Sequence, residues 1–138
     1  MSAVFLKAHG TGAKPLHDHW LARGASSLVD PGRTAFPRRP RMQGGDRLVL
    51  YASGWRRIFG IVEVLDEPST DAPSPADPAR WPWSVGVELL IVVPVLSNAP
   101  PVEAIGVSAR SMSQQSHIRL EPRHLERAVE ALAGVGLA

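Results

Sequence analysis

The chain has 138 residues, 44% hydrophobic and 20% charged, and no cysteine, which predicts one domain over residues 1–138 and excludes disulfides, thiolate zinc sites and cysteine nucleophiles. No apolar run reaches the about 20 residues of a membrane span and no export signal is recognised, so we expect a cytoplasmic protein without a membrane partner. The net charge of +2 hides an asymmetry, because residues 1–57 carry ten Lys and Arg against three Asp, whereas residues 58–138 carry five Arg against ten Asp and Glu.

The first expected strand is the apolar run "AVFLKA" at residues 3–8. Periodicity is then lost from Gly10 to Gly44, where Gly, Pro, Ser and Arg predominate, and residues 17–28 suit at most one short helix. A connection of this length inside a domain is usually functional or mobile. We therefore expect a long basic arm at about residues 10–45.

Two further strands, "DRLVLYAS" and "RIFGIVEVL", are nearly continuous in apolar character and are joined by a tight hairpin at Ser53 to Arg56. A loop with five prolines follows at residues 66–83. The next strand, "SVGVELLIVVPVL", has one wholly apolar face made by Val85, Val87, Leu89, Ile91, Val93 and Val95, and Pro94 marks a bulge or an edge.

The chain ends with a short strand, "SHIRL", and a helix. Pro122 suits the first helical position, and Gly134 is expected just past the end. The apolar stripe of the helix is formed by Leu125, Ala128, Val129 and Leu132. Five or six strands with two or three short helices predict an α+β fold, a small and strongly curved sheet or β-barrel with helices at its rim.

The order of "GDRLVLYASG", "GIVEVLDEP", "RWPWSVGVELL" and "QSHIRLEPRHLERAVEAL" resembles the EVE domains of the PUA-like superfamily, relatives of the YTH readers of methylated RNA. The resemblance covers about residues 44–132. It implies a small curved β-barrel with peripheral short helices, a C-terminal helix, and a pocket for a single, often modified, base of DNA or RNA.

The same resemblance implies which residues form that base-binding pocket. They lie at the end of the first strand, at the "YAS" end of the hairpin strand and in the "QQSH" segment: Lys7, Ala8, His9, Tyr51, Ser53, Gln114, Gln115, Ser116 and His117. The chain departs from the family at Ala8 and His9, where members have a small hydroxyl residue and an acid. It also has "RRPRMQGGD" in place of a tryptophan-bearing segment.

A base pocket needs a flat surface on which a base stacks, worth roughly 1–3 kcal/mol, and polar groups that read its edge. Trp55 and Trp83 are the favoured stacking residues, and Trp81 is given less weight. Each tryptophan could instead belong to the core, and Trp55 could fold back over the arm as a lid. The short polar side chains at the pocket could likewise serve only turns and strand ends.

Arginines dominate the segment from residue 33 to residue 57, where Asp46 is the only acid. Forked hydrogen bonds and long-range attraction suit such a cluster to phosphates, and solvated loop charge is the ordinary alternative. The expected phosphate-binding residues are Arg38, Arg39, Arg41, Arg56 and Arg57.

The histidines of "HDHW", His17 and His19, could bind zinc together with His9. No nucleophile motif, Walker loop or dinucleotide fingerprint accompanies them. We therefore expect no metal, no cofactor and no catalytic residue. The leading hypothesis is a nucleic-acid-binding domain that reads one base; the alternatives are a small-molecule domain using the same pocket and a metal-dependent enzyme using the histidines. The oligomeric state stays open.

Overall fold

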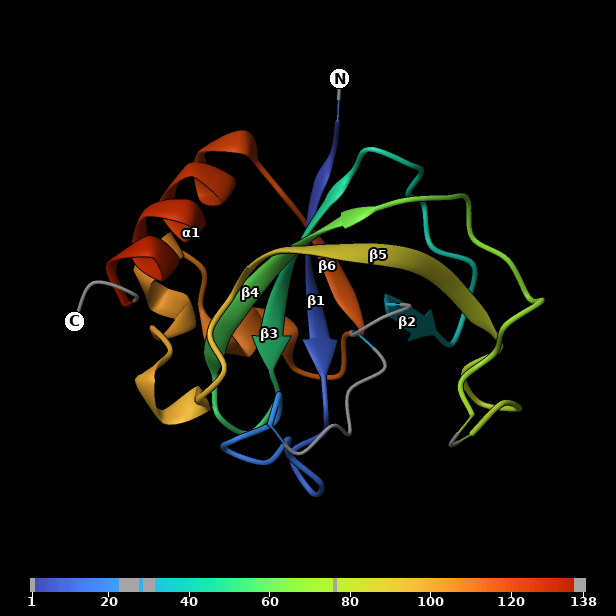
Figure 1. The fold of residues 1–138 in the computed structure, drawn as a ribbon, viewed down its shortest axis with the longest axis horizontal. Coiled ribbons are helices and arrows are strands. Elements are labelled where there is room, and N and C mark those ends of the chain that lie inside the picture. Colours follow the sequence, from blue (N-terminus) through green and yellow to red (C-terminus); the bar gives the residue numbers. More distant parts are fainter. Residues whose placement is uncertain (1, 23–27, 29–31, 76, 136–138) are drawn as a thin grey trace.

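A computed structural model describes residues 2–22, 28, 32–75 and 77–135. Its centre is a six-stranded sheet that curls strongly on itself, with the strand order β2-β5-β4-β3-β1-β6 (Figure 1). The strands are β1 (Val4–His9), β2 (Gly32–Phe36), β3 (Arg47–Ala52), β4 (Arg57–Val64), β5 (Trp83–Val92) and β6 (His117–Leu120).

The sheet is antiparallel except for β1 and β3, which run parallel from Val4 beside Arg47 to His9 beside Ala52. Both strands therefore end at the same edge of the sheet. The β3–β4 and β4–β5 registers each shift once, and such irregularities bend a strand and increase its twist. The two edge strands approach each other without a ladder, since the rings of Phe36 on β2 and His117 on β6 lie 5.1 Å apart.

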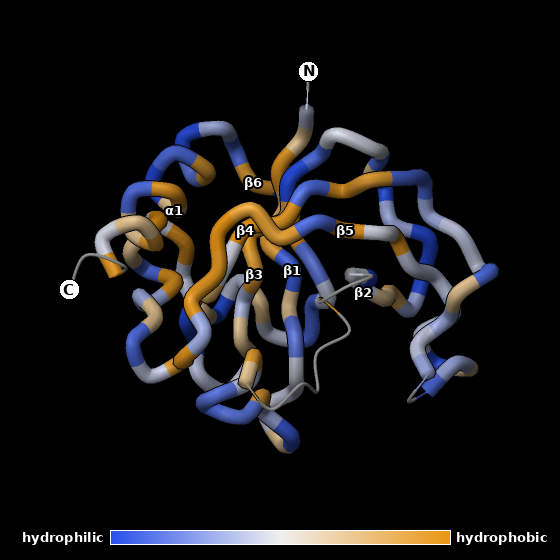
Figure 2. The backbone as a smooth tube through the Cα atoms, viewed as in Figure 1, coloured by the Kyte–Doolittle hydropathy of each residue, from blue (hydrophilic) through white to orange (hydrophobic). Residues whose placement is uncertain are grey.

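The core fills the interior of this curl, and the hydrophobic stretches of the strands gather at the centre of the molecule (Figure 2). Leu48, Val49 and Leu50 are all fully buried, as the near-continuous apolar run predicts. The helix α1 (Pro122–Val135) contacts β4 and β5 and buries Ala128 and Leu132. None of the helices described is long and apolar enough to cross a membrane.

Five local expectations need correction. Strand β2 lies within the arm, where no strand was expected, and residues 18–22 of the expected short helix form turns. Strand β5 ends at Val92, so Pro94 follows the strand and the register shift lies elsewhere. In α1 the helix continues through Gly134, and Val129 is 42% exposed. Three short 3₁₀ helices, Leu96–Asn98, Val102–Ile105 and Ala109–Met112, occupy the segment before β6.

Candidate functional site

A cavity of about 930 Å³ opens where β1 and β3 end. We call it the strand-end cavity. The loops that follow both strands, the proline-rich loop and the segment before β6 converge there. Its walls are Ala8, Gly10, Thr11, Gly12, Pro37, Tyr51, Ser53, Gly54, Arg56, Arg80, Trp81, Ala109, Arg110, Met112, Ser113, Gln114, Gln115 and Ser116.

The charge of this cavity is entirely positive. Arg56, Arg80 and Arg110 are exposed at its wall, and no Asp or Glu lines it. Within the described residues none of the three forms an ion pair with a carboxylate. Three guanidinium groups around one concave site attract an anion at long range and offer forked donors at contact.

Trp81 is the tryptophan of the cavity wall. The proline-rich loop holds it through backbone hydrogen bonds, from Trp81 N to Asp77 O and from Ser74 N to Trp81 O, both of 3.0 Å. The Nζ of Lys7 lies 5.7 Å from the centroid of its ring, and the Cζ of Arg80 lies 5.9 Å away. The indole is therefore half-buried, fixed in place and flanked by positive charge.

The backbone of the cavity wall adopts left-handed conformations that side chains disfavour. Arg56 has φ 58° and Gln114 has φ 60°, and these are the non-glycine residues with positive φ in the described chain. Both line the strand-end cavity. Such conformations cost about 1–3 kcal/mol each and gather at functional sites, because the surrounding structure must impose them.

Polar side chains complete the wall on the segment before β6. Gln114 and Gln115 are exposed, and Ser116 Oγ lies 2.9 Å from Nδ1 of His117. Each amide offers two donors and an acceptor, which is the inventory needed to read the edge of a base. On the opposite side, Ser53 N donates to His9 O, and burial raises the pKa of the Tyr51 phenol.

Lys7, His9 and His117 form a basic cluster inside the barrel, behind this wall. The Nζ of Lys7 donates to Ala8 O at 2.8 Å and lies 4.9 Å from the Phe36 ring. Burial lowers the pKa of Lys7 to about 7. Burial and then the charge of Lys7 also lower the pKa values of both histidines, that of His9 well below its usual range. His9 Nε2 is buried with no hydrogen-bond partner in the described chain.

The structure thus brings together part of the predicted base pocket. Tyr51, Ser53, Gln115 and Ser116 line the strand-end cavity. Lys7, His9 and His117 do not line it, but each contacts a residue that does: Lys7 bonds Ala8, the carbonyl of His9 accepts from Ser53, and the His117 ring lies beside Ser116.

Neither Trp55 nor Trp83 lies at the cavity wall. Trp55 is half-buried against the core, and its Nε1 donates to Leu16 O at 2.9 Å, so it covers the start of the arm. Trp83 carries the guanidinium of Arg39 over its ring at 5.6 Å. The tryptophan at the cavity is Trp81, to which the sequence argument gave the least weight.

The predicted phosphate-binding arginines are divided by the fold. Arg56 lines the strand-end cavity, whereas Arg57 donates to the carbonyls of Ser97 and Ala99 at 3.0 and 2.7 Å. Arg38 is exposed. Sequence reasoning missed Arg80 and Arg110, although Arg80 directly precedes Trp81 and Arg110 lies four residues before Gln114.

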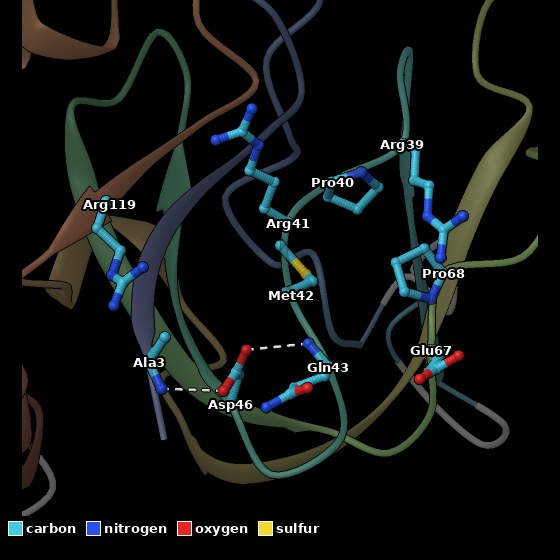
Figure 3. Close-up of a pocket in the computed structure, with 10 residues that line it drawn as sticks. All are labelled: Ala3, Arg39, Pro40, Arg41, Met42, Gln43, Asp46, Glu67, Pro68 and Arg119. Atoms are coloured by element: carbon cyan, nitrogen blue, oxygen red, sulfur yellow. Dashed lines mark hydrogen bonds between the residues drawn. The ribbon is translucent and has the colours of Figure 1, made fainter. Parts of the chain in front are cut away.

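Arg39 and Arg41 line a second cavity of about 620 Å³, which we call the arm cavity (Figure 3). It lies at the start of β1. The carboxylate of Asp46 accepts hydrogen bonds there from the backbone N of Ala3 and of Gln43, each at 2.9 Å. Its walls are Ala3, Arg39, Pro40, Arg41, Met42, Gln43, Asp46, Glu67, Pro68 and Arg119.

The histidines of the alternative metal hypothesis have the following surroundings. The rings of His17 and His19 lie 6.1 Å from each other, and His9 packs against Phe59 at 6.0 Å. Asp18 accepts from Ser97 N at 2.7 Å. Among the residues that the structure describes, no group of three or more His, Asp or Glu side chains could hold a metal ion.

Several solved structures share this fold over nearly the whole chain. Rpa0253 from Rhodopseudomonas palustris is 14% identical, covers 95% of this chain and 93% of its own, and has a TM-score of 0.59. Atu2648 from Agrobacterium tumefaciens is 15% identical over 98% and 94%, with a TM-score of 0.57. Human THYN1, in complex with 5-methylcytosine-containing DNA, is 12% identical over 99% and 97%, with a TM-score of 0.54.

No protein-family model matches the chain, and no curated protein matches it. At identities this low the likeness is one of fold. It confirms the predicted fold class, a small curved β-barrel with short peripheral helices and a C-terminal helix.

Proposed function

We propose that this protein is a nucleic-acid-binding domain that takes one base of a strand into the strand-end cavity. The observation that carries the proposal is the composition of that cavity: three arginines, an indole and several small polar groups, with no carboxylate. The indole can stack on the face of a base. The arginines can bind the phosphates on either side of that base.

Each part of the wall has a role in this proposal. Trp81 provides the stacking surface, and Gln114, Gln115 and Ser116 read the edge of the base. Arg56, Arg80 and Arg110 hold the phosphates on either side of it. A base inside a duplex would have to leave the stack first, so a single-stranded or easily opened site should bind more tightly.

The comparison with THYN1 supports this assignment, because a protein of the same fold is seen in complex with DNA that contains 5-methylcytosine. A modified base is therefore the first ligand to test, in DNA and in RNA. We propose a binding role with no cofactor. The buried cluster of Lys7, His9 and His117 serves in this proposal as the polar backing of the cavity wall.

The test is a binding screen with fluorescently labelled single-stranded DNA and RNA of one sequence, carrying cytosine, 5-methylcytosine, adenine or N6-methyladenine at the central position. We expect one base to bind best, and Arg80→Gln and Arg110→Gln to weaken that binding roughly ten-fold each through the loss of charged contacts. Arg127→Gln is the matched control, because Arg127 of α1 lines neither cavity and its substitution removes the same positive charge.

Two results would contradict the proposal. If no oligonucleotide binds at low salt, the cavity does not serve nucleic acid. If free nucleosides bind as tightly as oligonucleotides and the arginine variants leave affinity unchanged, the cavity is that of a small-molecule domain.

A further inference from the structure

The arm cavity has no role in the function proposed above, yet three arginines reach it from two separate parts of the chain. Arg39 and Arg41 come from the arm, and Arg119 comes from β6 on the other side (Figure 3). All three are exposed, and within the described chain none forms an ion pair with a carboxylate. Their hydrogen-bond donors are therefore available to a ligand.

Two of these guanidinium groups are held in place by aromatic rings. The Cζ of Arg39 lies 5.6 Å from the centroid of Trp83, and the Cζ of Arg119 lies 5.4 Å from that of Phe5. A guanidinium resting on a ring keeps its N–H edges free and loses less conformational freedom when an anion binds. The arm cavity is thus partly organised for an anion.

The acids of the cavity do not cancel this charge. Asp46 lines the cavity but is 3% exposed, and each of its carboxylate oxygens already accepts a backbone hydrogen bond, from Ala3 and from Gln43. Glu67 is exposed at the rim and has no ion pair among the described residues. Three arginines therefore stand against two carboxylates, of which Asp46 is already hydrogen-bonded to the backbone.

Three segments of the chain connect the two cavities. On the arm, Pro37 lines the strand-end cavity and Arg39 lines the arm cavity. At β6, Ser116 lines the strand-end cavity and Arg119 lines the arm cavity. At β1, Ala8 lines the strand-end cavity and Ala3 lines the arm cavity. These steps are two residues on the arm, three at β6 and five along β1, so the longest spans about 17 Å at about 3.3 Å per residue. An unstacked single strand spans more per nucleotide than the about 3.4 Å of duplex rise, so it covers that distance in at most about five nucleotides.

We propose that the arm cavity is a second phosphate-binding site for the strand whose base occupies the strand-end cavity, at most about five nucleotides away and in one direction only. The inference rests on the proposed function and adds a footprint length and a polarity to it. Arg39, Arg41 and Arg119 bind the distal phosphates, and Glu67 weakens the site.

The experiment measures binding of oligonucleotides from two to eight nucleotides long that carry the preferred base at the 5′ end in one series and at the 3′ end in the other. In one series affinity should rise sharply at one length of no more than about six nucleotides, where the strand reaches the arm cavity. In the other it should rise only gradually. The dinucleotide measures the strand-end cavity alone.

Variants identify the second site independently of length. The double variant Arg41→Gln/Arg119→Gln should remove the rise, weakening the eight-nucleotide ligand roughly ten-fold while leaving the dinucleotide unchanged. Glu67→Gln should strengthen the long ligand and not the short one. Arg127→Gln again controls for net charge, and melting temperatures confirm that the surface variants stay folded.

The outcomes separate the two proposals. If short and long ligands bind alike, or if the double variant leaves the long ligand unchanged, the arm cavity is not a phosphate site, although the base-binding proposal stands. If affinity rises equally in both series, the arginines act as diffuse charge and the directional footprint is wrong. If no ligand binds at all, both proposals fail.

Discussion

At the scale of single residues, the most unusual group is the buried amine of Lys7. It is 4% exposed, has one hydrogen-bond acceptor in the carbonyl of Ala8, and rests on the rings of Phe36 and Trp81. After burial, the charge of Lys7 in turn lowers the pKa values of its neighbours His9 and His117. Because burial disfavours the charged form, its pKa falls from 10.5 to about 7.

This shift predicts how stability depends on pH. Above pH 10.5 the amine is neutral in the folded and unfolded states and does not change the free energy of unfolding. As pH falls, the amine takes up its proton first in the unfolded chain, which stabilises the unfolded state. This loss of stability continues until pH reaches the pKa of Lys7 in the folded protein, about 7. The free energy of unfolding should thus rise between pH 7 and pH 9.5, at up to about 1.4 kcal/mol per pH unit. Urea melts of wild type and Lys7→Met measure it. The Met variant, similar in volume, should be more stable at pH 7 and nearly flat over this range, and an unchanged slope would assign the dependence to other groups.

Two tryptophans have opposite expected roles, and truncating each one tests both. Trp81→Ala removes the stacking surface of the cavity wall, so it should weaken the preferred oligonucleotide at least ten-fold and cost only about 1 kcal/mol of stability. Trp55→Ala removes a half-buried ring and its hydrogen bond to Leu16, so it should cost about 3 kcal/mol and leave affinity nearly unchanged in the folded fraction. Denaturant melts run beside titrations decide. The reverse pattern would return the stacking role to Trp55.

At the scale of elements, the sequence predicts what local patterns can encode. Local sequence patterns alone predict the strands β3, β4 and β5 and the helix that begins at Pro122. The structure confirms these elements. Strand β2 was missed because "GRTAF" has little periodicity of its own. It is a strand because residues 83–87, some fifty positions away, supply its ladder. The three 3₁₀ helices are too short to have a periodic signal.

The candidate site was predicted in its location more fully than in its residues. Tyr51, Ser53 and the "QQS" segment were placed at the pocket by resemblance, and they line the strand-end cavity. The sequence does not show which tryptophan lies at the cavity, because the exposure of each one depends on the loop that covers it. The start of the arm folds over the hairpin tip and binds Trp55, whereas the proline-rich loop turns Trp81 toward the ends of β1 and β3.

At the scale of the whole molecule, the fold sorts the arginines by partner. Arg33, Arg47 and Arg123 lie within ion-pair distance of acids, and Arg57 is used by two carbonyls. The arginines at the two cavities have no carboxylate partner among the described residues: Arg39, Arg41, Arg56, Arg80, Arg110 and Arg119. A net charge of only +2 therefore coexists with a strand-end cavity lined by three arginines and no acid, and with an arm cavity where three arginines outnumber Asp46 and Glu67.

This distribution predicts the salt dependence of binding. If six arginines each neutralise one phosphate of a single strand, the logarithm of affinity should fall with the logarithm of salt concentration with a slope of about −4, since each contact contributes about −0.7. Titrations of an eight-nucleotide ligand over a range of salt concentrations measure the slope, and each cavity Arg→Gln change should reduce its magnitude by about 0.7. Arg127→Gln, which removes a charge outside both cavities, should leave it unchanged. A flat dependence would mean that these arginines do not contact phosphate. If the slope is steep but Arg127→Gln reduces it as much as Arg110→Gln does, the electrostatic field of the whole protein binds the strand, and the two cavities do not.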